Sequence, residues 1–236
     1  MMPTTPFDPQ NRNDRNRLKK TILIRFGVII VLSCLMLFLP AGTWWYWQAW
    51  GYMATLFIPA TVLMIYLFQH DPQLLERRMR TREKEAKQKR IMKISLVIFL
   101  IAFLLPGLDH RFQWSSVPIL LTVVADFLVL LGYLLFARTL HENRYASRVI
   151  EVEQDQQVVS TGPYAIVRHP MYVANLLIFI FSPLALGSYW AMIPMLLLIG
   201  VVLARIKNEE EVLRKELRGY REYTQKTKYR LIPGVW

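Results

Sequence analysis

The stretch MYVANLLIFIFSPLALGSYWAMIPMLLLIGVVLARI, residues 171–206, decides the fold class. It carries no Asp, Glu, Lys or Arg before Arg205, and it is interrupted once, at Leu186-Gly187-Ser188. One membrane-spanning helix needs about 20 apolar residues, so this stretch is too long for a single helix. We predict two shorter helices joined by a tight turn at Gly187-Ser188.

Four further apolar runs precede this stretch, at Ile22–Leu39, Trp47–Phe68, Ile91–Leu108 and Val117–Leu140. Because lipid offers no hydrogen bonds to the backbone, such runs must be helical. The expected fold is an all-α, polytopic helical membrane bundle of about six spans, with four or five as the alternative and a cytoplasmic helix at the C-terminal end. An apolar content of 54% with only 19% charged residues excludes a soluble globular domain or a disordered chain.

The basic residues indicate the orientation. All 29 Lys and Arg residues except Arg25 and Arg111 fall within residues 1–21, 69–93, 138–170 and 205–236. Basic residues concentrate in cytoplasmic loops, so we predict a multi-pass integral membrane protein with both termini cytoplasmic, in the plasma or inner membrane if bacterial. The net charge of +12 is then explained by these loops rather than by nucleic-acid binding.

Two features need a separate interpretation. Asp126 lies in the middle of a predicted span, where it is either a functional carboxylate or a hydrogen-bonded packing residue. Cys34 is the single cysteine, which excludes a disulfide framework and a cysteine zinc cluster.

Polar residues that could bind a ligand or take part in a reaction gather in two segments of the C-terminal half. In the first, Gly162-Pro163 predicts a turn, and Pro170 suits the first turn of a helix. His169 then lies at a helix N-terminus, where free N–H groups can hold polar ligand atoms. The alternative interpretation is that His169 simply caps this helix.

The second segment contains three consecutive carboxylates. At about 100° per residue, Glu210 falls within the apolar stripe of a helix, Glu209 borders the stripe, and Glu211 points to water. Inward carboxylates require partners. Two interpretations are open: an ion pair with Arg205 or Arg168, or contact with a cationic or hydroxyl-rich ligand.

These residues resemble the isoprenylcysteine carboxyl methyltransferase family and, more loosely, the membrane phospholipid amine methyltransferases. The shared pattern is Arg168-His169-Pro170-Met171-Tyr172, the hydrophobic stretch Val173–Ala204 and Glu209-Glu210. Gly162-Pro163-Tyr164 upstream and Leu217-x-Gly219-Tyr220-x-x-Tyr223 downstream support it. The pattern departs from many members at Ala174, where they have Gly.

The resemblance covers roughly residues 140–236 and implies a helical membrane methyltransferase that binds S-adenosylmethionine without a Rossmann domain. It implies two catalytic residues: Arg205, which would orient an acceptor carboxylate, and Glu209. No metal site is predicted. The cofactor-binding residues that the resemblance implies are Tyr164, His169, Pro170, Tyr172, Glu209 and Glu210.

The predicted organisation has three parts. Residues 1–21 form a cytoplasmic tail, residues 22–140 form four spans with a basic cytoplasmic loop at 69–93, and residues 141–236 form the methyltransferase catalytic region. The expected partners are a lipophilic small-molecule or lipid-modified substrate and membrane lipids, with no nucleic acid.

The acceptor is most simply the carboxylate of an isoprenylcysteine-like substrate, which needs no general base. A phospholipid or other lipid amine would need one, from Glu209 or His169. A different class of enzyme, the NADPH-dependent membrane sterol reductases, shares a similar Arg-His-Pro-x-Tyr segment and a C-terminus like Tyr229–Gly234. A non-enzymatic membrane protein is the remaining alternative.

Overall fold

The computed structural model describes residues 7–79, 86–147, 149, 152 and 156–236. Within these residues all regular structure is helical, which confirms the predicted all-α class for the part described. The helices are α1 (Arg12–Ala41), α2 (Trp47–His70), α3 (Pro72–Met79), α4 (Ala86–Phe112), α5 (Ile119–Glu142), α6 (Pro163–Ile166), α7 (Pro170–Ala185), α8 (Met192–Glu216) and α9 (Tyr220–Lys226).

Four of these helices, α1, α2, α4 and α5, are long and apolar enough to cross a membrane. Helix α7 has only 16 residues, and α8 has 25 but ends in a charged segment. Between them Gly187 has φ +72°, which glycine adopts without steric cost, so the predicted turn is confirmed. The six-span count and the cytoplasmic position of both termini stay predictions.

The basic loop predicted at residues 69–93 is largely helical where it is described. Its first part forms α3 and its last part begins α4, while residues 80–85 lie outside the described residues. Leu74 and Leu75 of α3 are buried against α1, α2 and α5, so α3 packs onto the bundle. The α3 part of this loop therefore belongs to the folded core at this end of the bundle.

Small residues allow two close helix crossings. A Cβ on Gly132 of α5 would lie 2.8 Å from Ile178 and 3.0 Å from the carbonyl oxygen of Ala174 in α7. A Cβ on Gly107 of α4 would lie 2.5 Å from the carbonyl oxygen of Leu37 in α1. Ala174 is fully buried at the first crossing, so the small side chain at this position serves helix packing.

A buried polar network ties together the ends of the helices farthest from α9. The Asp109 carboxylate is 1% exposed and accepts hydrogen bonds from the Ser115 amide (2.7 Å), the Ser115 hydroxyl (2.6 Å) and the Ser188 hydroxyl. The Tyr46 hydroxyl donates to the carbonyl oxygen of Leu186. These bonds fix the α7–α8 turn to α4 and to the start of α2.

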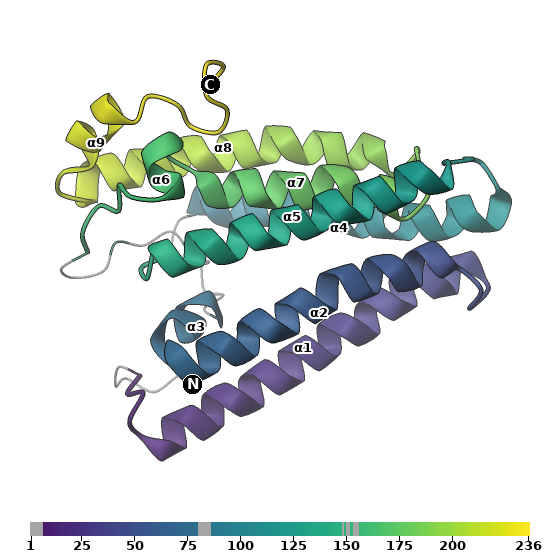
Figure 1. Ribbon diagram of the computed structural model, residues 1–236, viewed down its shortest axis with the longest axis horizontal. Coiled ribbons are helices and arrows are strands. Elements are labelled where there is room, and N and C mark those ends of the chain that lie inside the picture. The colour runs from purple at the N-terminus through teal and green to yellow at the C-terminus, as the bar shows by residue number, and fades with distance from the viewer. Residues whose placement is uncertain (1–6, 80–85, 148, 150–151, 153–155) are drawn as a thin grey trace.

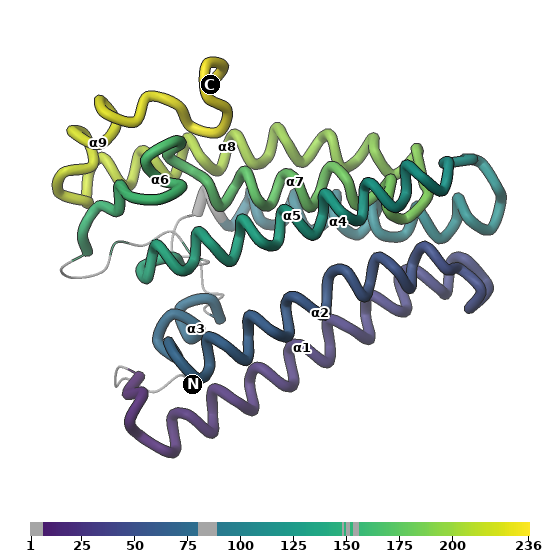
Figure 2. Tube along the Cα trace, in the orientation of Figure 1, coloured from purple at the N-terminus to yellow at the C-terminus, as the bar shows by residue number. Residues whose placement is uncertain are grey.

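The helix pair α1–α2 is not parallel to the other long helices. It meets α4 and α5 at the end farthest from α9 and diverges from them toward the end that carries α3 (Figure 1). Helices α3, α6 and α9 all lie at that second end (Figure 2). The short helices and the charged segment of α8 are thereby collected at one end of the bundle, which we call the inner end.

Candidate functional site

The turn that precedes α7 is held by the C-terminal segment. The backbone N–H of Arg168 donates to the carbonyl oxygen of Tyr229 (2.9 Å), and that of His169 donates to the carbonyl oxygen of Arg230 (3.0 Å). His169 is the N-cap residue of α7, but its side chain makes no capping hydrogen bond. The side chain of His169 therefore does not cap the helix, and its ring contacts Glu210 of α8 instead.

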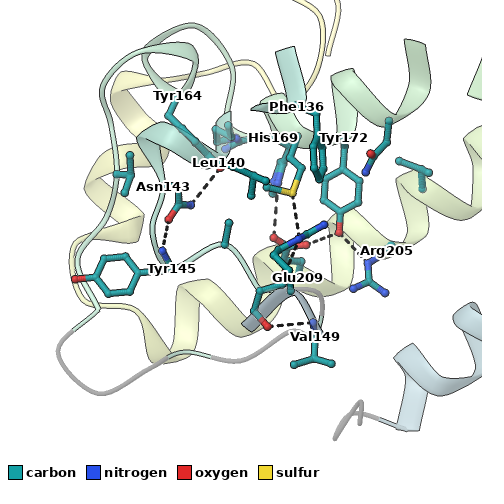
Figure 3. Close-up of a pocket in the computed structure, with 18 of the residues that line it drawn as sticks. Phe136, Leu140, Asn143, Tyr145, Val149, Tyr164, His169, Tyr172, Arg205 and Glu209 are labelled. Carbon is teal, nitrogen blue, oxygen red and sulfur yellow. Dashed lines mark hydrogen bonds and ion pairs between the residues drawn. The ribbon is translucent and has the colours of Figure 1, made fainter. Parts of the chain in front are cut away.

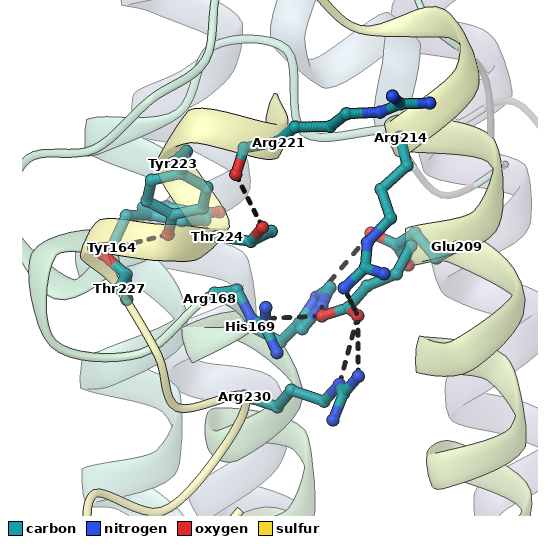
Figure 4. Close-up of polar contacts among 11 residues, drawn as sticks. Tyr164, Arg168, His169, Glu209, Arg214, Arg221, Tyr223, Thr224, Thr227 and Arg230 are labelled. Atoms are coloured by element: carbon teal, nitrogen blue, oxygen red, sulfur yellow. Dashed lines mark hydrogen bonds and ion pairs between the residues drawn. The ribbon is translucent and has the colours of Figure 1, made fainter. Parts of the chain in front are cut away.

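The Glu210 carboxylate is the centre of a buried ionic cluster. It is 3% exposed. Its Oε1 atom lies 3.2 Å from Nε2 of His169 and 3.1 Å from the guanidinium of Arg168. Its Oε2 atom lies 3.1 Å from the guanidinium of Arg230 and 3.5 Å from that of Arg214. Figure 4 shows the four basic side chains converging from the α7 turn, α8 and the C-terminal segment.

These contacts keep Glu210 ionised. Glu210 belongs to the charged segment of α8, beyond the apolar part of that helix. Burial alone would raise its pKa, but hydrogen bonds from His169 and Arg230, together with the charge of Arg168, hold the pKa at about 2. Because the ionised oxygens are occupied by basic partners, Glu210 fixes the orientation of His169 and the surrounding arginines.

Glu209 has a different environment one residue earlier on α8. It accepts a hydrogen bond of 2.6 Å from the Tyr172 hydroxyl, which itself accepts one of 2.9 Å from Nε of Arg205. The Nδ1 atom of His169 lies 4.0 Å from the other Glu209 oxygen. These four side chains point toward one another from α7 and α8 (Figure 3), and we call them the polar quartet: His169, Tyr172, Arg205 and Glu209.

The exposure of the three consecutive carboxylates follows the predicted helical phase. Glu210 is buried, Glu209 is of intermediate exposure, and Glu211 is exposed. The inward pair is therefore Glu209-Glu210 rather than Glu210-Glu211. The predicted ion pair with Arg168 is present on Glu210, whereas Arg205 reaches Glu209 through Tyr172.

The polar quartet lines a cavity of about 980 Å³. Tyr164 also lines it, whereas Pro170 and Glu210 do not. Of the predicted cofactor-binding residues, these two are thus placed behind the cavity wall. Pro170 begins α7, and Glu210 anchors His169.

Tyr164 is held at the cavity by contacts that the sequence did not indicate. Asn143 Nδ2 donates to its hydroxyl at 3.2 Å, and the Tyr223 hydroxyl donates to its carbonyl oxygen at 2.8 Å. Burial raises the pKa of Tyr164 to about 12, so its hydroxyl stays neutral near pH 7. The tyrosine therefore presents a neutral hydrogen-bonding group.

The cavity continues from the polar quartet between the apolar faces of the helices, and we call this part the apolar branch. Its walls come from α1, α2, α4 and α5, and thus from both helix groups of the bundle. Side chains that line it include Ala60, Leu63, Met64, Leu96, Phe99 and Phe136.

Asp126 lies outside this cavity. Its Oδ2 atom lies 3.6 Å from the position that a Cβ on Gly51 of α2 would take, and its Oδ1 atom is buried with no hydrogen-bond partner among the described residues. Asp126 of α5 therefore faces α2, and both interpretations of this carboxylate stay predictions.

In a comparison with known proteins, one family model matches part of the chain. The family model for phospholipid methyltransferases matches residues 120–219, from the second residue of α5 to Gly219 just before α9. No curated protein is significantly similar to the chain.

The matched segment is similar to the phospholipid methyltransferases, which belong to the same membrane methyltransferase superfamily as the isoprenylcysteine enzymes; the match does not separate the two. It indicates a membrane S-adenosylmethionine-dependent methyltransferase and contains every predicted site residue. It does not include Arg230, nor α1 to α4.

Proposed function

We propose that the protein transfers a methyl group from S-adenosylmethionine to the carboxylate of a lipophilic, isoprenylcysteine-like acceptor. The observation that carries this proposal is the continuity of the cavity, which joins the charged polar quartet to apolar walls between membrane helices. Such a cavity suits one ligand from the aqueous phase and one from the bilayer. Its volume lies at the upper end of the range for small-molecule sites.

The residues at the polar end fit the cofactor. Glu209 is a carboxylate at the cavity wall, suited to the cationic amino and sulfonium groups, and Tyr164 and His169 offer further hydrogen-bonding atoms. When bound, S-adenosylmethionine would supply an activated methyl group. Because the donor is already activated, the main task of the protein is to hold donor and acceptor in line, which supplies several kcal/mol.

Arg205 would orient the acceptor. Its guanidinium lines the same cavity and is held through Nε by Tyr172. A planar guanidinium grips a carboxylate at two points. Transfer forms a bond between the carboxylate oxygen and the methyl carbon and breaks the bond between sulfur and that carbon, so no proton has to move.

The match to phospholipid methyltransferases favours a second candidate, N-methylation of a lipid amine. An amine loses a proton on methylation and needs a base within hydrogen-bonding distance. His169 Nε2 is engaged with Glu210, while Nδ1 lies 4.0 Å from Glu209, so the base would be Glu209 or this nitrogen. Arg205 would then bind the lipid phosphate.

The remaining alternatives are an NADPH-dependent sterol-type reductase and a membrane protein without catalytic activity. Calorimetry on protein in lipid nanodiscs separates them from a methyltransferase. We expect S-adenosylhomocysteine to bind and NADPH neither to bind nor to compete. Binding of NADPH, or of neither compound, would contradict the proposed function.

A further inference from the structure

The N-terminal helix pair supplies one wall of the apolar branch. Four α2 residues that line it, Ala60, Leu63, Met64 and Leu67, are spaced by three and four residues and therefore share one helix face. Phe26 of α1 lines the same cavity. These helices precede the segment that matches the methyltransferase family.

The depth of the branch follows from the position of Ala60. It is ten residues from the inner end of α2 at His70, which corresponds to about 15 Å of helix. The hydrocarbon core of a bilayer is about 30 Å thick, so the predicted topology, with His70 at the inner membrane surface, puts Ala60 near the middle of the membrane. Farther along α2, Tyr52 is 1% exposed and its hydroxyl is 2.6 Å from Ser182 Oγ, so the bundle is closed there.

The charges at the inner end of the branch suit an acidic head group. Arg78 of α3 lines the cavity, with its guanidinium 5.2 Å from the Phe136 ring and a hydrogen bond of 3.1 Å to the carbonyl oxygen of Ser147. Lys93 of α4 and Arg205 of α8 line it as well. Among the described residues that line the cavity, Glu209 is the only carboxylate.

We propose that the α1–α2 pair forms the site that selects the hydrocarbon chain of the methyl acceptor, and that Ala60 sets the length accepted. The occupant is the chain of an acidic lipid whose head group lies beside Arg78, Lys93 and Arg205. Ala60 is the smallest of the α2 lining residues and the farthest from the inner end, so its missing side-chain volume keeps the deep end open. This inference rests on the proposed methyl transfer.

The test uses the variant Ala60→Phe and, as a milder change, the variant Ala60→Leu. The matched control is Ala54→Phe, on the same helix at an exposed position outside the cavity lining. The acceptors are N-acetylcysteines whose S-alkyl chains range from octyl to hexadecyl. For each variant we compare kcat/KM for the long and short chains, while S-adenosylhomocysteine affinity reports whether the protein is folded.

We expect Ala60→Phe to lower the long-to-short ratio of kcat/KM by roughly 10–60-fold, the effect of excluding two or three methylenes from burial. Ala60→Leu should lower it less, and Ala54→Phe should leave it unchanged. Equal chain-length profiles for Ala60→Leu and Ala54→Phe, with cofactor affinity intact, would overturn the inference. A wild-type protein that methylates none of the series would instead contradict the proposed carboxyl transfer.

Discussion

Replacing Glu210 by Gln should destabilise the protein strongly, because Glu210 is a buried anchor. The substitution keeps the shape of the side chain but removes the charge that Arg168, His169, Arg214 and Arg230 share at 3.1–3.5 Å. Arg168 is only 7% exposed and would be left as a buried cation with no compensating carboxylate at this position. Removing one partner of a buried ion pair costs roughly 3–5 kcal/mol.

For a chain of 236 residues this loss corresponds to a fall of roughly 6–20 °C in Tm. Thermal unfolding in nanodiscs, followed by circular dichroism, measures it. The control is Glu211→Gln on the exposed side of the same helix, which should stay within about 0.5 kcal/mol of the wild type.

A double variant tests the charge argument itself. If the excess positive charge is the cause, adding Arg230→Gln to Glu210→Gln should cost less than the sum of the two single changes, with a coupling of about 0.5–3 kcal/mol. Unfolding of Glu210→Gln at the same temperature as Glu211→Gln, or strict additivity with Arg230→Gln, would refute the ionic anchor.

Four further predictions concern the polar quartet, pH and topology. Glu209→Gln should weaken S-adenosylhomocysteine binding in calorimetry about 10–150-fold, since a hydrogen bond to a charged group contributes roughly 1.5–3 kcal/mol; affinity equal to that of Glu211→Gln would remove Glu209 from the site. Arg205→Ala should slow methyl transfer by about one to two orders of magnitude and leave S-adenosylhomocysteine affinity nearly intact. Arg205→Lys should restore the rate of methyl transfer only in part, whereas His169→Ala should lower S-adenosylhomocysteine affinity directly. Loss of S-adenosylhomocysteine binding in folded Arg205→Ala would place Arg205 with the cofactor. A depressed pKa stabilises only while the group is ionised, so the contribution of Glu210 should be full above about pH 4.5 and be lost as the pH falls to about 2, a loss absent from Glu210→Gln in acid titrations of unfolding. Reporter fusions at the two chain ends should both read cytoplasmic, and opposite readings would contradict the even number of spans.

The sequence was sufficient to predict the long apolar helices and part of the candidate site. Long apolar runs and the break at Gly187 predicted the helices because lipid forces apolar segments into helical structure. The periodicity of a helix distinguished Glu210 from Glu211.

The partners of Glu210 could be predicted only in part. Arg168 was a candidate from its position in the turn, but Arg230 reaches the carboxylate through pairing of Arg168 and His169 with the C-terminal segment. That pairing is a tertiary contact, and no local pattern around Tyr229 specifies it.

The apolar branch was not predicted for a different physical reason. Side chains that face lipid and side chains that face a lipid-binding cavity are equally apolar. Ala60, which lines the cavity, and Ala54, which is exposed, therefore have the same chemical character in the sequence. Only the three-dimensional packing of the helices, which places Ala60 and not Ala54 in the cavity lining, distinguishes them.

Methyl transfer with an identified product tests the central claim most directly. Purified protein in nanodiscs is incubated with S-adenosylmethionine carrying a labelled methyl group, a prenylated N-acetylcysteine and phosphatidylethanolamine, and the labelled product is identified by mass spectrometry. The predicted result is a labelled methyl ester of the prenylcysteine, released by mild base. Label found on the ethanolamine nitrogen would replace the carboxylate acceptor by a lipid amine, and label found on neither acceptor would contradict the account.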